Sequence, residues 1–391
     1  MNPHRVLMVH NAYQLTGGED SVVAAELALL RQHGHEVTEL RRDNRQIGAM
    51  GRMRVAAQTL WSCATHAEAL ELLRRNRPDV VHVHNTFPLI SPSLYWACAK
   101  VGVPVVQTLH NFRLACPQAM FLREGKVCER CLGKLPLPAL AHGCYRDSRA
   151  QTAVVVGMLA LHRTLGTFET KVTRYIALNE FCRAKFIQAG LPAQRIAVKP
   201  NFVDAPLLPA PRAREGMLFV GRLSAEKGVE VLRDAWRGCD GMQLRVAGIG
   251  PAAWMLKRRA GVEMLGPQTQ VQVQAEMQSA TALVLPSIWY ENFPRTLVEA
   301  FAAGLPVIAS RIGALAELVD DGQTGLLFEP GDAPGLSRVL RWANAHPREM
   351  AVMGAKARAR YESNYTPEIN YRQLLAIHRS AIDDMRGDAR P

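Results

Sequence analysis

Two carboxylates, Glu291 and Glu299, lie eight residues apart in the stretch LPSIWYENFPRTLVEAFAAG, and the sequence predicts a helix start between them. Pro294 pre-sets φ for a first helical turn, and Gly304 is placed to end the helix. The apolar residues 282–285 upstream indicate a buried strand. Glu291 is therefore expected on a loop and Glu299 inside a helix. The start of a helix that follows a strand offers unpaired N–H groups and a positive dipole end, which together favour an anion.

The elements before this stretch begin with a strand, a glycine loop and a helix. Residues 4–10 are apolar enough for a buried strand, and Gly17 and Gly18 follow it. Ser21 is the expected cap of an amphipathic helix that ends at Gly34. The glycine loop then falls at the carboxyl end of the first strand, where open α/β sheets bind ligands. A simple tight turn would need the same glycines.

The alternation continues through the first half and predicts a doubly wound parallel sheet. Further strands and helices are expected at 79–84, 103–110, 55–76 and 91–101. His84 and His110 both fall at strand carboxyl ends. For His84 we favour a structural role, whereas the neighbouring Asn111 and Phe112 make His110 the better site candidate.

Four cysteines occur where this periodicity fails. Their spacing is C-x11-C-x2-C-x12-C, at Cys116, Cys128, Cys131 and Cys144. Four thiolates can close a tetrahedral zinc site and hold an irregular insertion, here residues 115–149. We therefore predict a structural zinc ion, and the alternative is a set of reduced, partly buried thiols. The other cysteines are scattered singly and indicate core positions.

A proline-rich stretch separates two α/β series. Residues 200–216 hold four prolines and indicate a linker, after which strands and helices alternate again. The predicted organisation is a first domain at 1–200, a linker at 201–216 and a second domain at 217–365. A helical tail at 366–391 is expected to cross back to the first domain.

Charge is uneven along the chain, whose net charge is +12. Residues 1–200 carry 25 Lys and Arg against 14 Asp and Glu, while residues 201–391 carry 22 against 21. The basic half suggests an anionic partner such as a phospholipid surface, although dispersed arginines also suit an ordinary solvated surface. The apolar run 6–9 is too short for a signal peptide and is followed by polar residues, and the longest nearly uncharged apolar run, 152–161, is far shorter than a membrane span. We expect a cytosolic protein.

The combination of these features resembles glycosyltransferase family 4, the retaining sugar-nucleotide transferases of GT-B fold. Its elements are the glycine loop of the first domain, the basic loop GRLSAEKG (221–228) and the paired glutamates downstream. The resemblance covers almost the whole chain and is weakest across the cysteine insertion. It implies two Rossmann-like domains that face each other across a cleft. One departure is that Pro294 follows Phe293, where relatives often have glycine.

The resemblance also implies a role for each motif residue. Arg222 and Lys227 would bind the donor diphosphate, Arg through two N–H groups and Lys as a point charge. Glu299 would hold the ribose, Glu291 the donor sugar, and His110 would lie beside that sugar. The remaining donor contacts that the resemblance implies are Gly17, Gly18, Met264, Leu265, Asn292, Phe293 and the backbone N–H groups of the helix-start residues Arg295, Thr296 and Leu297.

Retention without a catalytic divalent metal is the implied mechanism, because the helix dipole and the two cations would replace the charge of a metal. The implied partners are a nucleotide-diphosphate sugar and a glycan or polyprenyl-diphosphate-linked acceptor. The basic half adds peripheral contact with the inner face of an anionic membrane.

Two alternatives stay open at this point. Another sugar-nucleotide enzyme of GT-B fold, such as an epimerase, would share the architecture. A zinc-bearing nucleic-acid-binding protein would fit the cysteines and the basic half, but it predicts aromatic residues among the basic ones, and aromatics are only 6% of the chain. We therefore expect no nucleic-acid partner.

Overall fold

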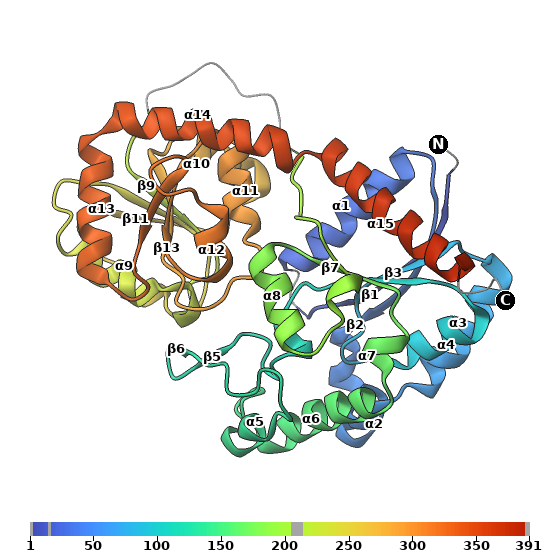
Figure 1. The fold of residues 1–391 in the computed structure, drawn as a ribbon. Coiled ribbons are helices and arrows are strands. Elements are labelled where there is room, and N and C mark those ends of the chain that lie inside the picture. The colour runs from blue at the N-terminus through green and yellow to red at the C-terminus, as the bar shows by residue number, and fades with distance from the viewer. Residues whose placement is uncertain (1–2, 15–16, 205–213, 388–391) are drawn as a thin grey trace. The chain divides into compact units, whose positions relative to one another are not determined.

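The computed structural model describes residues 3–14, 17–204 and 214–387, and these form two α/β units (Figure 1). Unit 1 comprises Met1–Met120, Glu129–Pro200 and Asn370–Pro391, and unit 2 comprises Phe121–Cys128 and Asn201–Ile369. Most of the predicted linker, 205–213, and the residues Leu15 and Thr16 of the glycine loop lie outside the described residues. Both units contain the predicted doubly wound architecture.

Unit 1 is built on a parallel sheet of six strands. In spatial order they are β2 (Glu36–Asp43), β1 (Arg5–Ala12), β3 (Val80–Asn85), β4 (Val105–Thr108), β7 (Arg174–Ala177) and β8 (Ile196–Val198). The strand order reverses between β1 and β3, so the crevice of this sheet lies beyond the carboxyl ends of those two strands. All six residues of β3 are buried, as expected for a strand covered on both faces.

The helices that connect the strands of unit 1 differ in detail from the prediction. They are α1 (Gly18–Gln32), α2 (Arg52–Leu60), α3 (Cys63–Asn76), α4 (Ser93–Val101), α5 (Leu137–His142), α6 (Arg149–Thr164), α7 (Thr167–Thr170) and α8 (Glu180–Gln188). Helix α1 begins at Gly18, so Ser21 lies inside it and is not its cap. The predicted helix 55–76 is two helices, because Ser62 caps α3 by accepting a hydrogen bond from Thr65 N at 3.3 Å.

Helix α15 (Pro367–Gly387) lies almost entirely in unit 1, although it follows unit 2 in the chain. Tyr371 stacks on the ring of His33 at 3.7 Å and its hydroxyl lies 2.8 Å from Nε2 of His35. The buried face of the helix consists of Asn370, Tyr371, Leu374, Leu375, Ile377, His378, Ala381 and Ile382. This face completes the core of unit 1.

Unit 2 contains a second parallel sheet of six strands. In spatial order they are β11 (Val262–Gly266), β10 (Leu244–Ala247), β9 (Met217–Val220), β12 (Ala282–Leu285), β13 (Val307–Ser310) and β14 (Gly325–Phe328). The order reverses between β9 and β12, the two strands that precede the basic loop and the glutamate stretch. The ligand position expected for such a sheet is therefore beyond the ends of these strands.

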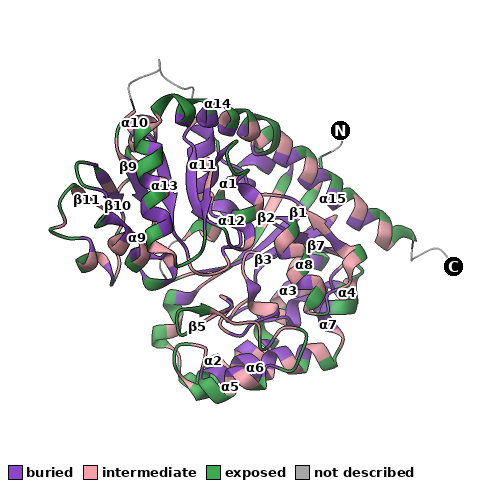
Figure 2. Cartoon of the chain, turned by 60° about the vertical axis from the view of Figure 1, so that its left-hand side comes forward, coloured by how far each residue is buried: buried purple, intermediate pink, exposed green. Residues whose placement is uncertain are grey.

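The helices of unit 2 cover both faces of its sheet. They are α9 (Val229–Trp236), α10 (Gln270–Ser279), α11 (Arg295–Ala302), α12 (Gly313–Leu318), α13 (Ala333–Ala345) and α14 (Pro347–Asn364). Figure 2 shows the buried residues concentrated on the strands and on the sheet-facing sides of these helices. A short hairpin, β5 (Leu122–Arg123) and β6 (Lys126–Val127), is counted with unit 2, although the prediction placed the whole cysteine insertion in the first domain.

No helix among the described residues combines the length and the apolar character needed to cross a membrane.

Candidate active site

The basic loop of unit 2 is held against two neighbouring loops by close backbone contacts. A Cβ atom added to Gly228, whose φ is 70°, would lie 1.8 Å from the carbonyl oxygen of Pro286. Ile288 N donates to Glu226 O at 3.0 Å, and Leu223 N donates to Ile249 O at 2.9 Å. The loops that follow β9, β10 and β12 are therefore packed together at the carboxyl edge of the sheet, and only glycine fits at position 228.

Glu291 and Lys227 form an ion pair inside this group of loops. Lys227 Nζ lies 2.6 Å from Glu291 Oε1, and the same oxygen accepts hydrogen bonds from Ser287 Oγ at 2.7 Å and Trp289 Nε1 at 3.0 Å. The ammonium also lies 5.5 Å from the centre of the Trp289 ring. Two residues that the sequence assigned to different parts of a donor are thus direct neighbours, and each fixes the side chain of the other.

Arg222 is paired with a carboxylate that the sequence analysis did not select. Its guanidinium donates to Ser224 Oγ at 3.2 Å and to Glu226 Oε1. Burial works to raise the pKa of Glu226, but the Ser224 hydroxyl and the Arg222 guanidinium outweigh it and the pKa is lowered. Glu226 is therefore ionised near neutral pH. The i, i+4 spacing of Arg222 and Glu226 could have indicated this pair.

Helix α11 begins at Arg295, after Pro294, as predicted. Glu299 lies on its second turn and accepts a hydrogen bond from Arg295 Nε at 3.0 Å. Burial raises the pKa of Glu299, and the charge of Arg295 partly opposes this. The prediction of three available N–H groups needs a correction, because Leu297 N donates to Pro294 O at 3.0 Å. Arg295 and Thr296 are the remaining candidates at this helix start.

The other predicted donor contacts of unit 2 lie along the same edge. Asn292 and Phe293 are buried in the loop that precedes α11, and the ring of Phe293 lies 6.0 Å from that of Tyr365. Met264 and Leu265 lie on β11, the strand at the outer edge of the sheet. They are separated from Glu291 by strands β10 and β9, so they could only contact a different part of an extended ligand.

In unit 1, Gly17 and Gly18 begin helix α1 beyond the end of β1. Gly17 N donates to Asp20 Oδ2 at 2.9 Å, which is one half of a capping box, because glycine has no side chain to make the other half. Among the described residues, a Cβ added to either glycine would meet no atom within 4 Å, so these neighbours do not crowd the position and no positive φ requires glycine here. The space beside the backbone is available to a ligand.

His110 has a partner that the sequence analysis assigned to the core. It lies two residues beyond β4, and its Nε2 is 2.9 Å from Nδ1 of His84, with the rings stacked at 5.2 Å. Burial lowers the pKa of His110 to about 3 and the pKa of His84 well below its ordinary value. Both rings are therefore neutral at pH 7. His84 and His110 also line a pocket of unit 1 together with Asn111 and Arg113.

One group of described side chains gathers three potential metal ligands within 4.8 Å of one another, namely Glu26, His82 and His84. However, Glu26 already forms a buried ion pair with Lys199 at 2.6 Å. A divalent cation would add two positive charges to a site whose only carboxylate is already neutralised, and such a site is costly in a buried environment. We assign no metal to this group.

The four cysteines are not part of that group. Cys116 and Cys131 are buried and lie with Cys144 in unit 1, whereas Cys128 follows the hairpin and is counted with unit 2. The structural zinc ion stays a prediction.

The family is decided by two matches to the sequence. Residues 208–360 match the model described as "Glycosyl transferases group 1", and residues 16–206 match "Glycosyltransferase Family 4". The chain belongs to the group 1 glycosyltransferases. Among the classes considered from the sequence, this membership favours the glycosyltransferase.

Several glycosyltransferases and a glycogen synthase are similar in sequence. A phosphatidyl-myo-inositol mannosyltransferase of Mycobacterium leprae is 33% identical over 327 residues, which cover 78% of this chain and 75% of the relative. A glycogen synthase of Mycobacterium tuberculosis is 36% identical over 308 residues, covering 74% and 66%. An amylovoran biosynthesis glycosyltransferase of Erwinia amylovora is 27% identical over 225 residues, covering 52% and 55%. The chain thus spans between about half and three quarters of the relatives that it matches.

Solved structures share the fold of this group 1 glycosyltransferase. Anabaena HepE in complex with UDP has a TM-score of 0.68 at 18% identity, covering 96% of this chain and all of that one. A sucrose-phosphate synthase from Thermosynechococcus elongatus has a TM-score of 0.71 at 18% identity, covering 97% and 100%. These similarities confirm the GT-B fold, with two Rossmann-like parallel-sheet domains.

Proposed function

We propose that the chain transfers a hexose from a nucleotide-diphosphate sugar to a glycan or lipid-linked saccharide, with retention of the anomeric configuration. The observation that carries this proposal is the Lys227–Glu291 pair at the point where the sheet of unit 2 reverses its strand order. Relatives that act in polysaccharide and glycolipid synthesis, and a neighbour crystallised with UDP-glucose, support it.

The reaction needs stabilisation of the negative charge that grows on the leaving diphosphate. Lys227 and Arg222 are cations on one loop, and the start of α11 adds a positive dipole end. In the structure both cations are held by glutamates, Lys227 by Glu291 and Arg222 by Glu226. A diphosphate would compete with these carboxylates for the cations, and the loop would already present them in place.

Glu291 is assigned to the donor sugar rather than to nucleophilic attack. Its Oε1 accepts hydrogen bonds from Lys227, Ser287 and Trp289, which hold the carboxylate in place and lower the nucleophilicity of that oxygen. Glu299 is assigned to the ribose, for which a carboxylate is a good acceptor pair. Front-face attack, in which the departing phosphate helps to take the acceptor proton, needs no protein nucleophile and no divalent metal.

The decisive experiment is a thermal-shift screen of the purified chain across GDP, UDP and other nucleotide sugars, followed by transfer assays with the donor that stabilises it. Magnetic resonance of the product should show the same anomeric configuration as the donor, and chelator should leave the rate unchanged. An inverted product would reject the retaining mechanism. A rate that falls with chelator and recovers with Mg²⁺ or Mn²⁺ would reject metal independence.

We further propose that the acceptor is presented at an anionic membrane, which unit 1 contacts through a basic surface formed by helices α2, α5 and α6. These helices pack together, and both cartoon views show them side by side (Figures 1 and 2). Exposed apolar side chains occur on them or in their loops at Met53, Leu135, Leu137, Leu161 and Leu165. The same helices and loops carry exposed basic residues, namely Arg52, Arg54, Arg130, Lys134, Arg146 and Arg149.

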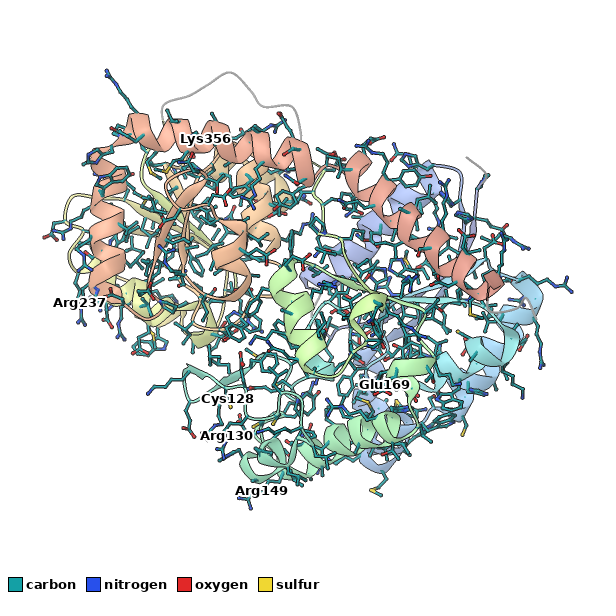
Figure 3. All side chains as sticks on the ribbon, viewed as in Figure 1. Cys128, Arg130, Arg149, Glu169, Arg237 and Lys356 are labelled. Carbon is teal, nitrogen blue, oxygen red and sulfur yellow. The ribbon has the colours of Figure 1, made fainter. Side chains whose placement is uncertain are left out.

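Charge and apolar exposure together match an anionic lipid surface, because basic side chains attract the headgroups while leucines enter the interface. Figure 3 shows Arg130 and Arg149 beside α5 and α6. Flotation with vesicles containing phosphatidylglycerol should recover the protein, and vesicles of phosphatidylcholine alone should not. The Leu135→Glu/Leu137→Glu variant should lose flotation, whereas Val271→Glu, at a 76% exposed residue of unit 2, should keep it. Equal recovery with both kinds of vesicle would contradict this proposal.

The structural zinc ion belongs to the same proposal, since it would hold the segment that carries Leu135 and Leu137. Metal analysis of the purified chain should give about one equivalent of zinc. Less than half an equivalent, with the thiols of Cys116, Cys128, Cys131 and Cys144 all titratable, would reject it.

A further inference from the structure

A series of buried polar side chains in unit 1 connects Lys199 to His110 through Glu26 and His84. It starts at the ammonium of Lys199, which lies 2.6 Å from Oε1 of Glu26. The other oxygen, Oε2, lies 3.5 Å from Nε2 of His84, and Nδ1 of His84 lies 2.9 Å from Nε2 of His110. The side chains of Lys199, Glu26 and His84 are fully buried. This series of contacts therefore connects the buried Lys199–Glu26 ion pair to the pocket that His110 lines.

The charges along this series follow from its surroundings. Burial works to raise the pKa of Glu26, but the charge of Lys199 and its hydrogen bond to the carboxylate oppose this, and the pKa is lowered. Glu26 is thus ionised, and the burial that lowers the pKa of His84 and His110 keeps both imidazoles neutral at pH 7. Each neutral ring carries one N–H group and one lone pair.

Glu26 decides which nitrogen of each ring carries the proton. A carboxylate 3.5 Å from Nε2 of His84 is attracted to an N–H group and repelled by a lone pair. His84 is therefore protonated at Nε2, and its Nδ1 can only accept a hydrogen bond. The partner across the 2.9 Å contact, Nε2 of His110, must be the donor. The remaining nitrogen of His110, Nδ1, then has a lone pair and no proton.

His82 obeys the same rule on the other side of Glu26. Its Nδ1 lies 3.8 Å from Glu26 Oε2, and its Nε2 lies 2.9 Å from the hydroxyl of Thr108. An N–H group at Nδ1 then faces the carboxylate, and the lone pair at Nε2 accepts a hydrogen bond from the Thr108 hydroxyl. Within the described residues, Glu26 Oε2, His82 Nδ1 and His84 Nε2 form no hydrogen bond, so the carboxylate acts on the two rings through its charge. One carboxylate oxygen thus orients two histidines.

We propose that Glu26, Lys199 and His84 are positioning residues that fix His110 as the Nε2–H tautomer, so that its Nδ1 accepts a hydrogen bond from a hydroxyl of the donor sugar. This inference rests on the proposed function, which places His110 beside that sugar. An acceptor with a fixed lone pair binds a hydroxyl without first changing its own protonation, and that arrangement is preorganised for transfer. An adjoining group that orients a functional histidine acts in the same way in metal sites.

The tautomer can be observed without any assay of activity. In ¹⁵N-histidine-labelled protein, long-range proton–nitrogen spectra distinguish protonated from unprotonated ring nitrogens, and loss of signals in His110→Gln assigns the ring among the 12 histidines. We expect His110 to be protonated at Nε2 only. A proton on Nδ1 of His110 in the unaltered protein would overturn the proposal.

Removing the charge of Glu26 should allow His110 to adopt both tautomers. Glu26→Gln alone would leave the ammonium of Lys199 buried and unpaired, and the protein could fail to fold. The Glu26→Gln/Lys199→Met variant removes both charges together and should fold, yet show both tautomers of His110. His162→Asn is the matched control, because His162 is also a buried histidine of unit 1 but contacts Leu60 O and Thr167. An unchanged His110 signal in the folded double variant would also overturn the proposal.

Kinetics then tests the role in transfer. In His84→Asn, the amide oxygen can replace Nδ1 as the acceptor for His110, whereas His84→Leu cannot accept. We expect His84→Leu to lower kcat by about 10-fold to 100-fold with little change in the KM for the donor, and His84→Asn to retain most of the rate. Equal losses in both variants, or none in either, would overturn the positioning role. If the unaltered protein transfers no sugar from any donor, the proposed function fails instead, and the spectra still decide the tautomer.

Discussion

The ammonium of Lys227 lies 2.6 Å from the carboxylate of Glu291, although 64 positions separate the two residues in the chain. They meet because β9 and β12 are neighbours in the sheet, so the loops that follow these strands share one edge. Neither side chain can be moved without affecting the other. Binding of the donor diphosphate by Lys227 and binding of the donor sugar by Glu291 would therefore be coupled.

The pair gives the first prediction. Lys227→Met should lower kcat by about 10²-fold to 10³-fold, because one preorganised charge at the leaving group is lost. Arg245→Met is the matched control, since Arg245 also forms an ion pair in unit 2, with Glu276 at 3.0 Å, but lies on β10 rather than on the loop. Steady-state release of nucleoside diphosphate measures both. Equal rates in the two variants would remove Lys227 from the diphosphate site.

Arg222 can be separated from ordinary surface arginines. Its side chain is 63% exposed and paired with Glu226, and the side chain of Arg237 is also 63% exposed and paired with Asp234. Arg222→Gln should lower kcat/KM for the donor about 10-fold or more, because a charge-assisted contact to phosphate is lost, while Arg237→Gln should leave it unchanged. If both variants keep full activity, Arg222 is a solvated charge and no more.

Gly228 should be intolerant of any side chain. Gly228→Ala places a Cβ 1.8 Å from Pro286 O, whereas Gly241, with a similar φ of 75°, would have no atom within 4 Å. Gly241→Ala should cost about 1 kcal/mol of stability from the left-handed backbone alone. Gly228→Ala should lower the melting temperature well beyond that control and should displace the loop that carries Lys227. Similar melting temperatures for the two variants would show that the loops separate easily.

Glu19 gives the stability a defined pH dependence. Burial raises its pKa from 4.5 to about 8, so the folded state holds a proton that the unfolded state releases above about pH 4.5. At Glu19 the folded state binds more protons in this range, so the contribution of Glu19 to the stability falls as the pH rises from about 4.5 to about 8.

Denaturant unfolding of Glu19→Gln isolates this contribution. The amide cannot ionise, so the stability of the variant relative to the unaltered protein should rise across that pH range and stay constant below it. Glu124→Gln is the control, because the side chain of Glu124 is 76% exposed. A constant difference between Glu19→Gln and the unaltered protein from pH 4 to pH 9 would contradict the raised pKa.

Much of the fold follows from local patterns in the sequence. Strand β12 occupies the predicted residues 282–285, and α11 begins after Pro294 as expected, because a short apolar run and a proline at a helix start are local signals. The break between α2 and α3 was missed, since the apolar spacing continues through it and only the capping hydroxyl of Ser62 marks it. The predicted start of α1 is also wrong. Ser21 is a good capping residue by type, but the helix begins three residues earlier, at Gly18.

The site was harder to predict than the fold. The residues carried over from the family lie in loops beyond the strands, at the start of α1, on β11 and on α11, and the sequence did not predict the partners that the structure gives them. Glu26 lies on a helix and looked like one more polar position, and only the return of the chain at Lys199 gives it a counter-ion. His84 was assigned to the core, and it is buried, yet it contacts His110. Such pairings join residues far apart in sequence, and a single sequence does not reveal them.

Helix α15 has a consequence for the order in which the protein is made. Unit 1 draws its last segment from residues after 369, and the buried face of α15 covers that unit. During synthesis, therefore, the first unit cannot finish folding until the whole of the second has emerged from the ribosome. A partly covered unit 1, with His35 and His82 still open to water, must persist for the time needed to translate about 170 residues, which is on the order of ten seconds.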